Sequence, residues 1–189
     1  MVSTHHLKRT VRIGALLTMS MITGPMTQPA QPRADAPSMV NAAWSSTYLQ
    51  PTEFASKGNG AVKVQRRMVI ALDRVRSALG RPIYNLSGYR DPIHNARVGG
   101  ARRSRHLVGD AVDIDLRPYD TWTRYVLAWH LIDNGFTSFG TYGDRPHMLH
   151  ADMGPRAAVW HHSGGRRPDW LKKALREWHW RPVTGSPHR

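Results

Sequence analysis

Residues 111–116 (AVDIDL) alternate between apolar side chains and small or acidic ones, which is the two-residue period of a β-strand. The alternation predicts two faces, with Val112, Ile114 and Leu116 on one and Ala111, Asp113 and Asp115 on the other. A carboxylate on a largely buried strand costs free energy unless it is paired or binds a cation. The segment therefore predicts a buried, half-polar strand whose acidic face has a positively charged partner.

Helical and strand-like patterns occur on both sides of this strand. Apolar residues at helical spacing predict helices over residues 62–79, 120–133 and 169–180. Short strands are expected over residues 81–86, 137–141 and 147–153. In the second helix, the residues that we expect to face the core are Trp122, Tyr125, Val126, Trp129 and Ile132. The predicted fold class is α+β, a small antiparallel sheet with flanking helices.

The amino-terminal segment has the layout of an export signal. Residues 1–12 are basic and carry no acid, and residues 13–23 form an apolar stretch that ends at Gly24 and Pro25. That stretch is too short to cross a bilayer core, which needs about 20 apolar residues. We expect an export signal and linker over residues 1–36, and therefore a periplasmic, extracellular or wall-associated protein.

The rest of the chain has the length of one domain. We expect this domain over residues 37–165, followed over residues 166–189 by a basic amphipathic helix and a tail. The helix carries tryptophans beside lysines and arginines, so contact with an anionic envelope surface is one expected use for it. Docking of the helix on the domain is the other expected use.

The chain is strongly basic: 27 Lys and Arg face 13 Asp and Glu, a formal net charge of +14 at pH 7. Nucleic acid, anionic lipid and the acidic polymers of a bacterial envelope would all be attracted to such a charge. The arginines are scattered, however, no known nucleic-acid motif is present, and export would separate the protein from DNA. We therefore expect no nucleic-acid partner. We also expect the protein to be a monomer.

Two histidine-containing segments predict a metal centre. The chain has no cysteine, so a metal must bind to nitrogen and oxygen. His106 and Asp113 are joined through a turn at Gly109, and the segment HMLHADMG supplies His150. Each histidine alone is more often an ordinary surface or core residue. Together, two imidazoles and one carboxylate form a ligand set that zinc accepts, with a fourth position left for water.

The stretch SGYRDPIHNARVGGARRSRHLVGDAVDID, with LQPTEFASKGNG before it and GFTSFGTYGDRPHMLHADMGPRAAVW after it, resembles the M15 zinc peptidases. The likeness covers roughly residues 48–160, carries the motif SxHxxGxAxD, and is closest to the M15A-type branch of D-Ala-D-Ala carboxypeptidases and murein endopeptidases. It implies a hedgehog/DD-peptidase-like fold and one zinc ion on His106, Asp113 and His150. It also implies that Arg90 binds or polarises a carbonyl or carboxylate of the substrate, with Ser104 as a hydrogen-bonding residue of the same site.

The resemblance further implies hydrolysis of amide bonds in peptidoglycan stem peptides or cross-links. Many relatives have an acidic general base three residues before the last histidine ligand, where this chain has His147. We favour His147 as the base, although it reaches the ion only if Pro146 ends a turn beside it. Asp152 is the rival candidate, and it could instead orient a ligand.

The departure at His147 keeps a second hypothesis open, a zinc-stabilised module that binds the cell wall without catalysis. A third, a metal nuclease or nucleic-acid binder, rests only on the excess of arginine and on His94-Asn95.

Overall fold

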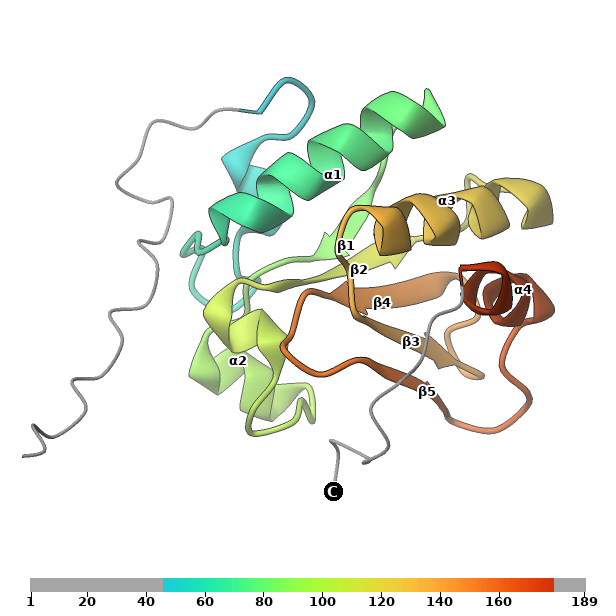
Figure 1. The fold of residues 1–189 in the computed structure, drawn as a ribbon. Helices are drawn as coiled ribbons and strands as arrows, with labels where there is room; N and C mark the ends of the chain where they lie inside the picture. The colour runs from blue at the N-terminus through green and yellow to red at the C-terminus, as the bar shows by residue number, and fades with distance from the viewer. Residues whose placement is uncertain (1–45, 179–189) are drawn as a thin grey trace, which may run out of the picture. The chain divides into compact units, whose positions relative to one another are not determined.

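The computed structural model describes residues 46–178 (Figure 1). The predicted export signal and the end of the carboxy-terminal tail lie outside these residues. The helices are α1 (Arg66–Leu79), α2 (Pro92–Arg97), α3 (Thr121–Asp133) and α4 (Asp169–Glu177), with short 3-10 helices η2 (Pro51–Phe54) and η3 (Arg105–Val108). The strands are β1 (Asn85–Ser87), β2 (Ala111–Asp115), β3 (Ser138–Tyr142), β4 (Met148–Asp152) and β5 (Ala158–His162).

The strands form one mixed sheet in the order β1-β2-β4-β3-β5. The predicted α+β class is confirmed. Pairing is antiparallel between β1 and β2, β2 and β4, and β4 and β3, but parallel between β3 and β5. The expectation of a purely antiparallel sheet is thus wrong at one edge. The reason is topological: the chain reverses after β4 and passes to the far side of β3, and two strands that both run opposite to β4 are parallel to each other.

The two faces of the sheet have different surroundings. Helices α1, α3 and α4 lie on one face, whereas α2 lies on the other side (Figure 1). The apolar residues of β2 and β4, including Ile114 and Leu149, are fully buried in the core with Leu72 of α1 and Leu131 of α3. The opposite face of these two strands carries their polar residues. The alternation of side chains in β2 therefore gives one face that packs in the core and one polar face that can hold a functional site.

Helix α3 ends at the predicted residue, Asp133, and begins directly after Asp120. The Asp120 side chain caps its amino end by accepting a hydrogen bond from Thr123 N. Its buried face differs from the expected one. Leu127 and Leu131 are fully buried, whereas Trp122 is 65% exposed. Of the residues expected in the core, Ile132 is buried, whereas Tyr125 and Trp129 are only partly buried. The aliphatic side chains of α3 thus fill the core, and its large aromatic ones lie at the margin.

Helix α4 packs on α3 through a buried stripe that includes Trp170, Leu171 and Leu175, and this stripe belongs to the same core as the sheet. At the edge of this contact, Trp129 of α3 meets Trp178 with ring centroids 5.0 Å apart. Docking on the domain is therefore what α4 does in the structure. Within residues 46–178, no helix has the length and apolar character needed to span a membrane.

Candidate metal centre

His106 is positioned by the short helix η3 and the turn that follows it. The Ser104 Oγ accepts a hydrogen bond from the His106 backbone N–H at 3.4 Å and so caps η3. Gly109 then ends η3 in the left-handed conformation, with φ of 68°, and a Cβ at this position would lie 2.3 Å from Lys63 O. Only glycine fits both demands, and the turn it makes leads directly into β2.

The register of the sheet brings the other two residues together. Asp113 of β2 lies directly opposite His150 of β4, and Ala111 lies opposite Asp152. Because side chains two residues apart on a strand share a face, His150 and Asp152 point to the same side as Asp113. All of these polar side chains are at least nine-tenths buried.

Three donor atoms converge at this point. The Nε2 of His106 lies 3.1 Å from the Nδ1 of His150 and 3.3 Å from the Oδ1 of Asp113, and His150 Nδ1 lies 3.0 Å from the same oxygen. Zinc bonds of about 2.0–2.1 Å in tetrahedral geometry place neighbouring donor atoms about 3.3–3.4 Å apart. His106, Asp113 and His150 therefore fit a zinc ion, and among the described residues they form a group able to hold a metal.

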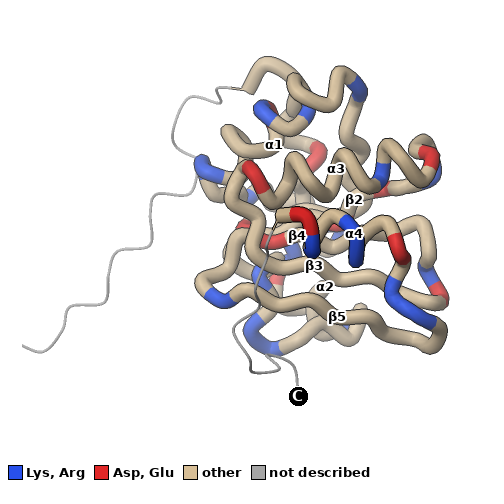
Figure 2. Tube along the Cα trace, turned by 45° about the vertical axis from the view of Figure 1, so that its right-hand side comes forward, with Lys and Arg blue, Asp and Glu red and all other residues tan. Residues whose placement is uncertain are grey.

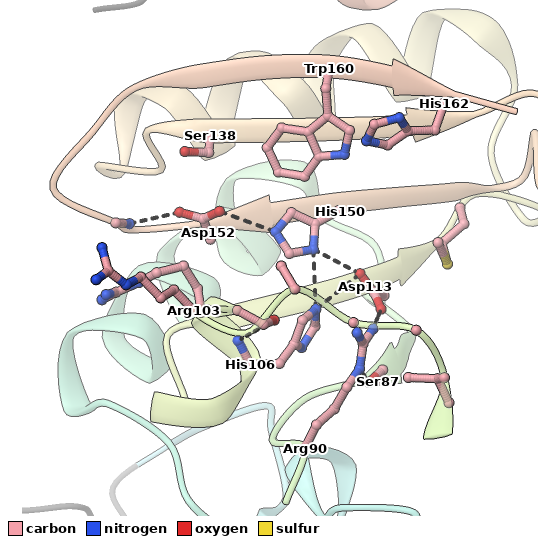
Figure 3. A pocket seen from close by; sticks show the side chains of 18 of the residues that line it. Ser87, Arg90, Arg103, His106, Asp113, Ser138, His150, Asp152, Trp160 and His162 are labelled. Atoms are coloured by element: carbon pink, nitrogen blue, oxygen red, sulfur yellow. Dashed lines mark hydrogen bonds and ion pairs between the residues drawn. The ribbon is translucent and has the colours of Figure 1, made fainter. Parts of the chain in front are cut away.

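Each ligand group is held by a second partner (Figure 3). His106 Nδ1 contacts the backbone oxygen of Gly88, which fixes the tautomer with a free lone pair on Nε2. His150 Nε2 lies 3.1 Å from Asp152 Oδ2, and the outer oxygen of Asp113 pairs with Arg90. Such partners are typical of metal sites, where they orient the ligands.

The charges of these groups are strongly coupled. Burial lowers the pKa of His106, which keeps this imidazole neutral. Burial also opposes a charge on His150, but the hydrogen bonds that its ring donates to Asp113 and Asp152 outweigh this effect and raise the pKa of His150 to about 9. Burial raises the pKa of Asp113, yet the two imidazoles outweigh that effect and hold the pKa well below its ordinary range. Without metal, the centre thus holds a proton on His150 between two carboxylates.

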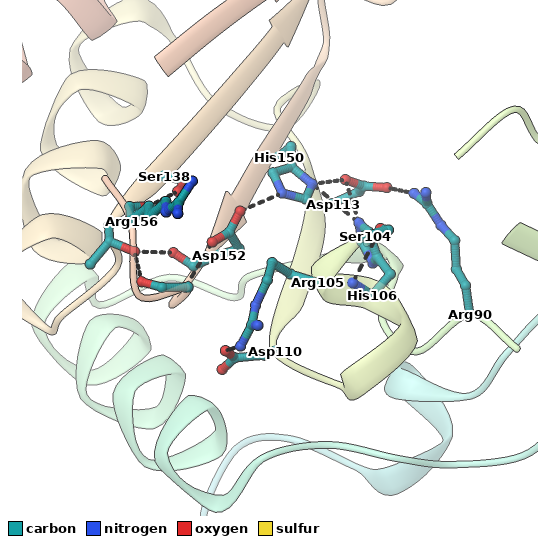
Figure 4. A network of polar contacts seen from close by, with 12 residues as sticks. Arg90, Ser104, Arg105, His106, Asp110, Asp113, Ser138, His150, Asp152 and Arg156 are labelled. Atoms are coloured by element: carbon teal, nitrogen blue, oxygen red, sulfur yellow. Dashed lines mark hydrogen bonds and ion pairs between the residues drawn. The ribbon is translucent and has the colours of Figure 1, made fainter. Parts of the chain in front are cut away.

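The centre lies in the wall of a cavity of about 880 Å³, and Arg90, Ser104 and Asp152 line the same cavity. Arg90 donates from Nε to Ser87 Oγ at 3.2 Å and from Nη2 to Asp113. Both oxygens of Asp152 are engaged, because Oδ1 accepts from Gly154 N at 2.8 Å while Oδ2 faces His150 (Figure 4).

His147 is not among the described residues that line this cavity. It is half-buried just before β4, where its backbone oxygen accepts a hydrogen bond from Leu116 N. The hydrogen bond from Arg117 is the main cause that lowers the pKa of Asp115, and His147 adds a smaller effect. A turn spans Pro146 and His147, as the sequence reading required. The role of His147 as general base stays a prediction.

Several cavity residues were not foreseen from the sequence. The indole of Trp160 lies beside His150, with ring centroids 5.0 Å apart, and it fits there because residue 140 is glycine: a Cβ on Gly140 would lie 2.4 Å from the indole. Tyr142 and His162 continue this aromatic wall. A glycine inside a strand is a signal of close approach and could have indicated such packing.

An α+β domain that gathers two imidazoles and a carboxylate at zinc-ligand spacing in an open cavity has the site of a metal-dependent hydrolase. The Peptidase M15 family model matches residues 39–152, more than half of the chain and all three residues of the centre, so the chain belongs to the M15 peptidases. No curated protein matches the chain.

Proposed function

We propose that this protein hydrolyses amide bonds in peptidoglycan stem peptides or cross-links with one zinc ion as cofactor. Membership of the M15 peptidases supports zinc-dependent hydrolysis. The single observation that carries the proposal is the convergence of His106, Asp113 and His150, whose donor atoms lie 3.0–3.3 Å apart in the wall of a large cavity. The export signal expected from the sequence and the basic net charge suit a substrate that lies outside the cytoplasm and carries free carboxylates.

A bound zinc ion would act as a Lewis acid and lower the pKa of its water to about 7. The chain's own groups would hold the ligands and the substrate. Arg90 fixes the outer oxygen of Asp113, and a guanidinium has five N–H donors, so it retains donors for a substrate carbonyl. Asp152 fixes the ring of His150. Ser104 supports the helix that carries His106 and borders the space for the substrate.

A second candidate function is the zinc-stabilised, non-catalytic wall-binding module. One observation favours it: apart from Asp113, Asp152 is the only carboxylate among the described residues that line the cavity, and both of its oxygens already accept hydrogen bonds. A module that needs the metal only for its fold would show this arrangement, because no free acid is then required.

The experiment is digestion of purified sacculi by the zinc-loaded protein, with mass spectrometry of the released muropeptides. His150→Ala should abolish product formation and tight zinc binding, whereas His130→Ala, which removes a histidine outside the cavity, should change neither. The mass of each product identifies the bond that is cut. Stoichiometric zinc with intact sacculi and intact muropeptides would refute catalysis and favour the binding module.

A further inference from the structure

The wall of the cavity carries many more basic than acidic side chains. Two carboxylates line it, Asp113 and Asp152, and both face the histidines. The basic side chains that line it are Lys57, Arg90, Arg103, Arg105, Arg145 and Arg156. Lys and Arg also occur on other segments of the domain (Figure 2), but these six line the cavity that contains the proposed metal centre. A divalent ion adds to this positive charge, so the cavity favours an anionic ligand.

Most of these cations already have a structural partner. Arg90 pairs with Asp113, and Arg105 shares the fully buried carboxylate of Asp110 with another arginine. Arg145 lies over the Tyr142 ring, 4.5 Å from its centroid. These interactions hold the three guanidinium groups in place and offset part of their positive charge.

Among the arginines of the cavity wall, Arg103 and Arg156 differ from the other three. Both are exposed, and neither has an acidic partner within 4.0 Å among residues 46–178. They come from two distant segments, the loop before η3 and the loop after β4. The second loop is held in place because Ser138 Oγ donates a hydrogen bond to the Arg156 backbone oxygen at 3.0 Å.

The two arginines approach the same end of the cavity. Figure 3 shows Arg103 near Asp152, and Figure 4 shows Arg156 beside Ser138 on that side, whereas Arg90 lies on the other side of His150. His150 and Asp152 are two residues apart on β4, which corresponds to about 6.6 Å along an extended chain. A peptide that follows β4 would therefore bring a group one or two residues from the metal to this end.

We propose that Arg103 and Arg156 form a subsite for a free carboxylate of the substrate, one or two residues away from the scissile amide. The substrate class is then an acidic peptide, and the inference rests on the proposed hydrolysis at the zinc centre. Guanidinium groups suit this role because their planar N–H donors match both oxygens of a carboxylate. Amidation of that carboxyl group would remove the charge and one of the two acceptor oxygens.

The test compares two synthetic stem peptides that differ only in carrying a free carboxylate or a carboxamide at the acidic positions. The wild-type protein should cleave the acidic form with a kcat/KM at least about tenfold higher, the size expected for one charge-assisted hydrogen bond. The double variant Arg103→Gln/Arg156→Gln should lose this preference through slower cleavage of the acidic form alone. The control Arg66→Gln/Arg74→Gln removes the same charge from the exposed face of α1, outside the cavity, and should keep the preference.

Equal cleavage of both peptides by the wild type, or an unchanged preference in the double variant, would overturn the subsite. If neither peptide is cleaved although zinc is bound, the proposed hydrolysis fails, and equilibrium binding of the same two peptides by calorimetry decides the subsite separately. Tighter binding of the acidic form that disappears in the double variant supports it. Equal binding, or no binding of either form, refutes it.

Discussion

Replacing Asp152 by Asn separates two roles that the structure allows for this side chain. The carboxylate is 5% exposed and accepts two hydrogen bonds, from His150 Nε2 at 3.1 Å and from Gly154 N at 2.8 Å. When a metal occupies Nδ1 of His150, Nε2 carries a proton and needs an acceptor. An Asn side chain has one acceptor oxygen to direct at these two donors, so at least one of the hydrogen bonds is lost or weakened.

The expected loss of zinc affinity follows from the loss of one of these two hydrogen bonds. A hydrogen bond to a charged group contributes about 1.5–3 kcal/mol, which corresponds to roughly 10- to 100-fold in an equilibrium constant. The same range is typical for removing the partner of a metal-bound histidine. We therefore expect Asp152→Asn to weaken zinc binding by about 10- to 100-fold, while kcat at saturating zinc changes less than tenfold.

Competition with a chromophoric chelator measures the zinc affinity, and cleavage of a stem peptide at a series of zinc concentrations gives kcat. Asp144→Asn serves as the control, because Asp144 is an exposed carboxylate that does not line the cavity. An unchanged zinc affinity together with a loss of kcat of about 10² or more would refute the orienting role and identify Asp152 as the general base.

Three further predictions concern the neighbours of the centre. Arg90→Ala should lower kcat by about 10²–10³, measured on the same peptide, because Asp113 loses its partner and the substrate loses a positively charged donor. Gly140→Ala should lower the free energy of unfolding by about 1–3 kcal/mol in urea titrations, since the new methyl group would displace the Trp160 indole; an unchanged midpoint would contradict the packing. In the metal-free protein, the folded-state pKa of His150 is about 9 against an ordinary 6.5, so its contribution to stability is complete below pH 6.5 and is lost as the pH rises through 9. Urea midpoints at pH 6 and pH 9.5 should show this fall, and His150→Gln should reduce it.

The parts of the fold that follow from local pattern were predictable from the sequence. The alternation over residues 111–116 placed Asp113 on the polar face of a buried strand, and the cap at Asp120 placed the start of α3. These features depend on period and capping, which a short stretch of sequence contains in full.

Features that depend on packing between distant segments were not predictable in the same way. The outward position of Trp122 follows from which side of α3 faces the core, the side that carries Leu127 and Leu131. The parallel pairing of β5 follows from the path of the chain around β3. The approach of Arg103 and Arg156 to one end of the cavity joins two loops more than 50 residues apart in sequence, and no local pattern encodes it.

The most direct test of the account is the position of the metal. Crystals grown with zinc, measured at wavelengths on both sides of the zinc absorption edge, should give a single strong anomalous peak bonded to His106 Nε2, Asp113 Oδ1 and His150 Nδ1. The same crystals of His106→Ala should lose this peak. A fully occupied zinc site formed by other side chains, with no density between these three, would contradict the assignment of the centre and the hydrolysis built on it.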